Sequence, residues 1–226
     1  MFPRCRSGIL VALAAAFIPA HADKITWEAV LPPGGETDPI VLNKALGKTD
    51  ASSLEQVKGS KGELRPQAFP ELAPKTSAHE GLFRVVLTKE GAVLPPDMTG
   101  TGPFFLLKAE GRYYLLTPRN FAALYGPVKT KEEMFPYVSV YTKVFLDPYA
   151  NLVRTPTDVK DFQKVEPPAL TEVTEADGGW AVRLILFSAY RVRAFYEARL
   201  RLKQSGEVVV EEKVHKIKEL GPGFLF

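Results

Sequence analysis

Residues 170–213, LTEVTEADGGWAVRLILFSAYRVRAFYEARLRLKQSGEVVVEEK, decide the predicted fold of this chain. The stretch holds four β-rich runs joined by short turns: Leu170–Glu175, Trp180–Ala189, Ala194–Lys203 and Glu207–Lys213. Asp177-Gly178-Gly179 and Ser205-Gly206 mark two of these turns, since glycine tolerates the backbone angles that tight turns require. Strands connected this closely run antiparallel. The last third of the chain therefore predicts an antiparallel β-meander.

A helix is expected just before the meander. The hydroxyl of Thr130 can accept a hydrogen bond from the amide of Glu133, whose carboxylate can reach back to residue 130, as in a capping box. Pro136 disturbs this pattern because it removes a backbone hydrogen bond, so a capped turn followed by a strand over 137–146 is the alternative. Four apolar residues share one face of the predicted helix: Met134, Val138, Tyr141 and Phe145.

A helix followed by a meander predicts a strand-rich α+β fold, in which the sheet packs one face on the helix and exposes the other. This outline is similar to the cystatin-like architecture of a helix lying on an antiparallel sheet. No motif in the chain is specific enough to assign a family. Further strands are expected upstream, over 83–88, 104–108 and 112–117, with a short helical turn over 120–125 that Gly126-Pro127 ends.

The N-terminal part has a different composition. A strand is expected over 24–31, around Trp27, and residues 47–79 then contain few large apolar side chains. Such a segment buries too little apolar area to offset its ordering entropy, which predicts a poorly structured, flexible or extended stretch. The alternative is an ordered loop anchored by Phe69 and Leu72. The expected organisation is an N-terminal segment, 23–80, and an α+β globular domain, 81–226.

Residues 1–22 have the pattern of a secretory signal peptide. Arg4 and Arg6 precede an apolar run over 9–18, and Ala20-His21-Ala22 forms a small-x-small cleavage site, so cleavage is expected after Ala22. The apolar run is too short to cross a bilayer, so the mature chain is not expected to be an integral membrane protein. We therefore expect a periplasmic or secreted bacterial protein.

Charge and cysteine content exclude several functional classes. The chain has 29 basic and 26 acidic residues, and loss of Arg4 and Arg6 leaves 27 basic residues, a net charge of +1. A nearly neutral exported chain is not expected to bind nucleic acid. The single cysteine, Cys5, lies in the leader, so the mature chain has no disulfide, no cysteine ligand and no cysteine nucleophile. Neither a metal nor another cofactor is predicted.

Catalytic patterns are weak in this sequence. The two mature histidines, His79 and His215, are far apart in sequence and have no partner at metal-ligand spacing. Neither a nucleophile-elbow motif nor a phosphate-binding loop occurs. Three carboxylate pairs have simpler explanations in helix capping, a polar loop and a strand end: Glu132 with Glu133, Asp158 with Asp161, and Glu211 with Glu212.

The strongest functional signal is a group of basic and aromatic side chains on the two central strands of the meander. Alternation along 194–203 is expected to turn Phe195, Glu197, Arg199, Arg201 and Lys203 toward water and the intervening residues toward the core. Arginine presents a planar fork that fits carboxylate, phosphate and sulfate groups. The alternative is a solvated face whose basic residues pair with neighbouring glutamates. The predicted contact residues are Tyr190, Arg191, Arg193, Tyr196, Arg199 and Arg201.

These observations favour a non-enzymatic binding or accessory protein of the bacterial cell envelope. Its expected partner is an acidic protein or an anionic envelope glycan. The alternative is a secreted, metal-independent hydrolase acting on an envelope polymer. A cleft with two facing carboxyl groups, one with a raised pKa, would favour the hydrolase.

Overall fold

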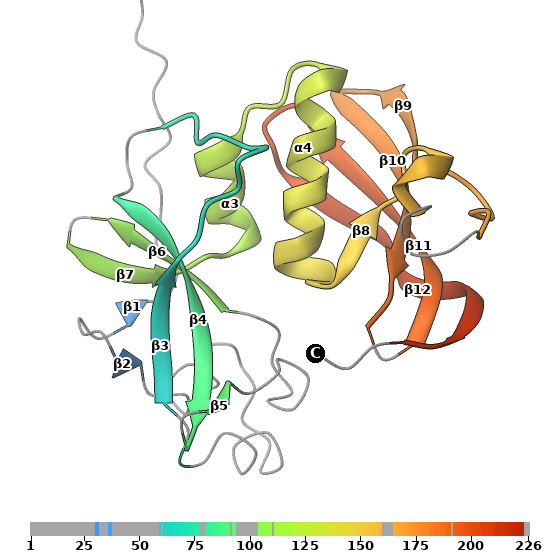
Figure 1. Ribbon diagram of the computed structural model, residues 1–226. Helices are drawn as coiled ribbons and strands as arrows, with labels where there is room; N and C mark the ends of the chain where they lie inside the picture. Colours follow the sequence, from blue (N-terminus) through green and yellow to red (C-terminus); the bar gives the residue numbers. More distant parts are fainter. Residues whose placement is uncertain are drawn as a thin grey trace, which may run out of the picture.

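The computed structural model describes residues 30–31, 36–37, 59, 61–76, 80–90, 92–93, 104–109, 111–159, 165–190 and 192–223. In these ranges the chain forms two antiparallel sheets with two α-helices between them (Figure 1). The predicted strand-rich α+β class is confirmed: the upstream strands expected over 83–88, 104–108 and 112–117 belong to a second sheet, and the helical turn expected over 120–125 is an α-helix. The expected signal peptide, most of the strand over 24–31, His79, Asp161 and Arg191 lie outside the described residues.

Sheet A is seven-stranded, with the order β1-β7-β6-β4-β3-β2 and with β5 paired to β4 beside this path. The hairpin of β6 and β7 lies where Glu110-Gly111 predicts it. The strands are β1 (Val30–Leu31), β2 (Glu36–Thr37), β3 (Lys61–Pro66), β4 (Gly81–Lys89), β5 (Ala92–Val93), β6 (Phe104–Ala109) and β7 (Arg112–Leu115).

Sheet B is the predicted meander. Its order is β12-β11-β10-β8, and β9 pairs with β10 beside β8, so two short strands share one edge of β10. The strands are β8 (Ala150–Leu152), β9 (Glu172–Ala176), β10 (Gly179–Ser188), β11 (Val192–Lys203) and β12 (Val208–Pro222). The last strand, β12, is fifteen residues long and runs well beyond the predicted end at residue 213.

Both helices begin at threonine caps. Helix α3 (Pro118–Tyr125) starts at Thr117, and helix α4 (Lys131–Tyr141) starts at Thr130, whose Oγ1 accepts the amide of Glu133 at 3.3 Å. The Glu133 carboxylate accepts the amide of Lys129 at 2.7 Å, one residue earlier than a standard capping box predicts. Helix α4 contains Pro136 and continues into a π-helical turn, Thr142–Leu146. The helix prediction is therefore confirmed, and the alternative strand over 137–146 is wrong.

One hydrophobic core connects the two sheets through the helices. Leu82 and Leu107 of sheet A and Leu184 and Leu200 of sheet B all belong to this cluster. Phe121 of α3 lies at its centre, with ring centroids 5.0 Å from Tyr137 and 5.6 Å from Phe145. The face predicted for α4 is confirmed, because Met134, Val138 and Tyr141 are buried and Phe145 packs on the core.

The outer face of sheet B, which points away from α4, is only partly open to solvent. Phe195 is fully buried there, in a second cluster with Ile185, Phe187, Val153 and Val159. Residues from the segment after β8 therefore cover the part of this face around Phe195. The expectation that Phe195 and Glu197 face water is wrong: this segment covers Phe195, and Glu197 is buried in a pair with Arg183.

Residues 61–76 are packed against the rest of the molecule. β3 pairs with β4 across the composition change near residue 80. Leu72 is buried, and Phe69 packs on the core with its ring 5.9 Å from that of Phe105. The two expected anchors therefore hold this part of the segment, as the ordered-loop alternative describes.

Candidate functional site

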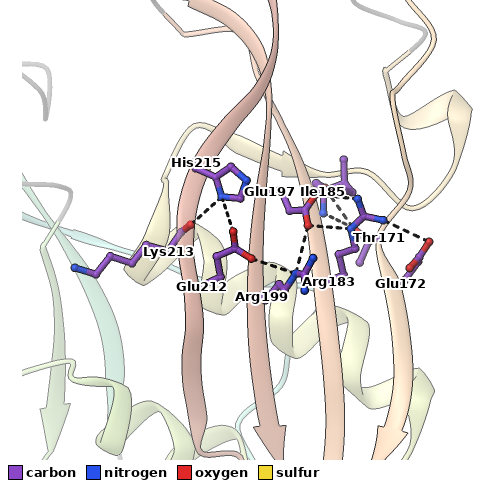
Figure 2. A network of polar contacts seen from close by, with 9 residues as sticks. All are labelled: Thr171, Glu172, Arg183, Ile185, Glu197, Arg199, Glu212, Lys213 and His215. Atoms are coloured by element: carbon purple, nitrogen blue, oxygen red, sulfur yellow. Dashed lines mark hydrogen bonds and ion pairs between the residues drawn. The ribbon is translucent and has the colours of Figure 1, made fainter.

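The most organised polar surface of the described residues is a network that crosses every long strand of sheet B (Figure 2). We call it the charge ladder: Glu172 on β9, Arg183 on β10, Glu197 and Arg199 on β11, and Glu212 and His215 on β12. Alternation along β9, β10 and β11 turns these side chains to the outer face, away from α4, and on β12 a register shift brings Glu212 and His215, three residues apart, opposite Arg199 and Glu197. The ladder therefore follows directly from the register of sheet B.

The central rung joins Arg183 and Glu197. The guanidinium donates two hydrogen bonds to the carboxylate, from Nε to Oε1 at 3.0 Å and from Nη2 to Oε2 at 2.9 Å. The Glu197 side chain is only 9% exposed, whereas that of Arg183 is 37% exposed. Hydrogen bonds from Arg183 hold the pKa of Glu197 below its ordinary value of 4.5, and Arg199 adds to this effect. This carboxylate is therefore ionised and held in one geometry.

From this rung the ladder extends to both sides. Glu172 lies 3.8 Å from Arg183, and Arg199 lies 3.5 Å from Glu197 and 3.1 Å from Glu212 (Figure 2). On the edge strand, Nδ1 of His215 is 3.4 Å from the Glu212 carboxylate. Each acidic group thus lies next to a basic group, which lowers the energy of both on the sheet surface.

Two further pairs continue this arrangement toward the β11–β12 turn. Arg201 contacts Glu211 at 2.9 Å, and Lys203 contacts Glu207 at 2.8 Å. Besides His215, the ion pairs on this face join four arginine and lysine side chains to five glutamates: Arg183, Arg199, Arg201 and Lys203 with Glu172, Glu197, Glu207, Glu211 and Glu212. A basic face was expected, and the paired face that the sequence offered as the alternative is what forms.

A hollow of about 420 Å³ lies over the ladder, lined by residues of β9, β10, β11 and β12. Glu172, Arg183, Arg199 and Glu211 line it with charges of both signs, and Ala181 contributes a small side chain beneath them. A concave surface with fixed groups of both signs is suited to a partner that also carries both signs.

The six predicted contact residues do not form one patch. Arg199 and Arg201 belong to the charged face, but Tyr196 points to the α4 side and packs on the core. Arg193 lies at the far end of β11, where its Nε donates to the carbonyl of Pro222 at 2.8 Å. Tyr190 stacks on Tyr149 with ring centroids 4.1 Å apart. Arg191 is outside the described residues.

Sequence reasoning missed a second hollow, of about 490 Å³, between α4 and the segment that follows β8. Its lining comes from three distant parts of the chain, including Glu71, Phe135, Lys143 and Arg154. Lys143 is paired with Glu71 at 3.2 Å, and the Arg154 guanidinium lies 5.8 Å from the centre of the Phe135 ring. No short motif could have predicted this hollow, since only tertiary packing brings these residues together.

The three carboxylate pairs named from sequence have structural roles where they are described. Glu133 accepts the amide of Lys129, Asp158 accepts the amides of Arg154 and Thr155, and Glu211 and Glu212 pair with arginines. Burial raises the pKa of Asp147, but its carboxylate accepts the amide of Tyr149 at 2.8 Å and lines neither hollow.

In the described ranges, no group of three or more His, Cys, Asp or Glu side chains is arranged to hold a metal ion. No helix in those ranges has the length and apolar character needed to cross a membrane. The chain matches no known protein family, no curated protein and no solved structure.

Proposed function

We propose that this protein is an exported, non-enzymatic binding module of the bacterial cell envelope, and that the charge ladder is its contact surface. The observation that carries the proposal is the hollow over the ladder, where ionised groups of both signs are fixed on a hydrogen-bonded sheet. Groups held in place before binding lose little side-chain entropy when a partner docks, which favours recognition.

The hydrogen-bonded carboxylate of the charge ladder, Glu197, does not suit the alternative of a hydrolase. Glycoside hydrolysis needs a carboxylic acid that keeps its proton near neutral pH, and therefore a raised pKa. Glu197 beneath the ladder has a lowered pKa because Arg183 and Arg199 stabilise its charge. Asp147, whose pKa is raised, is engaged in a turn away from the hollow. Binding therefore accounts better for the chemistry of this face.

The pairing of charges also distinguishes between the two expected classes of partner. A polyanionic glycan would meet five carboxylates on this face together with four basic groups. A protein surface with alternating acidic and basic side chains can instead exchange ion pairs with the ladder, group for group. A protein partner of mixed surface charge is therefore the better fit, and an anionic glycan is the competing outcome.

The test is affinity capture from an envelope extract with residues 23–226 as bait. The test variant carries Arg199→Ala and Arg201→Ala, which leave the buried pair of Arg183 and Glu197 intact. The matched control is Arg65→Ala on β3, because Arg65 is exposed to a similar extent as Arg201 and makes a similar ion pair, at 3.0 Å to Glu63. Circular dichroism confirms that each variant is folded.

We expect the parent and the Arg65→Ala control to retain the same protein, which mass spectrometry identifies. Its affinity for the double variant, measured with the purified partner, should fall at least about tenfold, the usual cost of losing an interfacial arginine contact. If the double variant retains the same partner as strongly as the parent, the charge ladder is not the contact surface. If only an acidic polysaccharide is retained, the protein-partner assignment is wrong.

A further inference from the structure

Strand β12 has features that set it apart from the rest of the described surface. It forms one edge of sheet B, and its fifteen residues pair with β11 on one side. The described part of the chain contains three exposed large hydrophobic side chains, and all three lie on this strand: Val209, Val210 and Ile217, which are 40%, 39% and 36% exposed. A long edge strand with exposed apolar side chains is a template for pairing with another strand.

The charges of β12 are divided between its two halves. Glu211 and Glu212 lie in the first half, whereas the second half carries Lys213, His215, Lys216 and Lys218 and one acidic residue, Glu219, which pairs with Lys216. Among the described residues, the ammonium groups of Lys213 and Lys218 have no ion-pair partner. Two such strands placed side by side in opposite directions would bring the acidic half of each next to the basic half of the other.

We propose that β12 binds β12 of a second copy of this chain in antiparallel orientation, so that the two B sheets join into one sheet across a two-fold axis. Such an interface is self-complementary, as twofold dimers require. With the two-fold axis perpendicular to the sheet at residue 214, Glu212 of one copy lies opposite Lys216 of its partner, and Val210 lies opposite Lys218. The exposed apolar side chains of both copies then lose part of their contact with water.

Two features of β12 usually protect a sheet edge, and both are compatible with this pairing. The register with β11 shifts at several points, between Arg193 and Ala194 and again between Arg199 and Leu200, and lysines line the second half of β12. Bulges and lysines discourage association with an unrelated strand. In the proposed dimer the lysines meet carboxylates, so the same residues that exclude other strands select a second copy.

The dimer does not depend on the proposed function, because it uses the strand edge and not the hollow. It would nevertheless enlarge the charged surface. The charge ladder ends on β12 at Glu212 and His215, so joining two copies through this strand would bring two ladders together on one continuous sheet face. Failure of the partner capture and failure of dimerisation are therefore separate results.

The first experiment is sedimentation equilibrium of residues 23–226 over a range of protein concentrations, at low and at high ionic strength. The test variant is Lys216→Glu with Lys218→Glu, and the control is Lys89→Glu with Lys131→Glu, which changes the net charge equally at exposed positions away from β12. We expect the parent and control to dimerise, and the test variant to associate at least about tenfold more weakly because its second half now repels the first half of its partner. Added salt should weaken the parent dimer.

A second experiment locates the interface directly. Residues 23–226 contain no cysteine, so Lys213→Cys in this fragment introduces a single thiol next to the proposed two-fold axis. We expect this variant to form a disulfide-linked dimer on mild oxidation, whereas Lys89→Cys forms no disulfide-linked dimer. A parent that is monomeric at all concentrations would overturn the proposal. So would a dimer unaffected by the charge reversal and not cross-linked through residue 213, which would place the interface elsewhere.

Discussion

Glu197 shows how one residue can depart from the pattern of its strand. The alternation of β11 assigns it to solvent, yet it is buried, and the guanidinium groups of Arg183 and Arg199 contact its carboxylate. A buried carboxylate is costly unless it is paired and hydrogen-bonded. The two hydrogen bonds from Arg183 supply that pairing, and they make the ion pair a part of the fold as well as of the candidate binding surface.

This pairing predicts a dependence of stability on pH. The pKa of Glu197 in the folded chain lies below 4.5, so its contribution is complete above that pH and is lost as the pH falls through the lowered value. In urea titrations between about pH 6 and about pH 3, Glu197→Gln should lose less unfolding free energy than the parent, by on the order of 1 kcal/mol. Equal losses in the two proteins would show that Arg183 does not stabilise the ionised form.

At the scale of elements, the turn from β9 to β10 depends on two adjacent glycines for different reasons. Gly178 has a φ of +72°, and its missing side chain would point into open space. Gly179 lies inside the sheet, where a Cβ would come 2.0 Å from the carbonyl oxygen of Leu202 on β11. The first glycine serves the turn, and the second allows β11 to approach β10 closely.

The two positions should therefore respond differently to alanine. Gly178→Ala should cost about 1 kcal/mol of unfolding free energy, the usual cost of the left-handed backbone region for a residue with a Cβ. Gly179→Ala should cost more than about 3 kcal/mol, because the backbone of β11 must move. Urea unfolding measures both values, and similar costs at the two sites would contradict the close approach at Gly179.

For the whole molecule, the central question is whether the two sheets depend on each other. Phe121 of α3 contacts rings from α3, α4 and the π-helical turn, and the surrounding cluster includes side chains from both sheets. A core shared in this way couples the two sheets, since neither can separate from the helices without exposing apolar surface.

Phe121→Ala should lower the unfolding free energy by about 3–5 kcal/mol, the usual range for removing a buried phenylalanine ring. Native-state hydrogen exchange then tests the coupling. Amides of β4 and β6 in sheet A should lose protection together with amides of β10 and β11 in sheet B as denaturant is added. Sheet A amides that exchange freely while sheet B stays protected would show two separate folding units.

The sequence by itself was sufficient for the elements whose signals are local. Thr130 with Glu133 marked the start of α4, the glycine turns marked the hairpins of sheet B, and the four apolar positions of α4 marked its buried face. Caps, turns and side-chain periodicity act over a few residues, so the chain displays them without reference to the rest of the fold. The α+β class followed from these signals alone.

Only the tertiary structure decided which surfaces remain open and which charges meet. Phe195 became buried because a distant segment crosses the sheet, and Arg199 and Arg201 lost their expected freedom because β12 supplies Glu212 and Glu211 beside them. The second hollow also joins residues from three separate stretches of chain. Burial and ion pairing depend on distances in space between residues far apart in sequence, and the packing of the complete fold sets those distances.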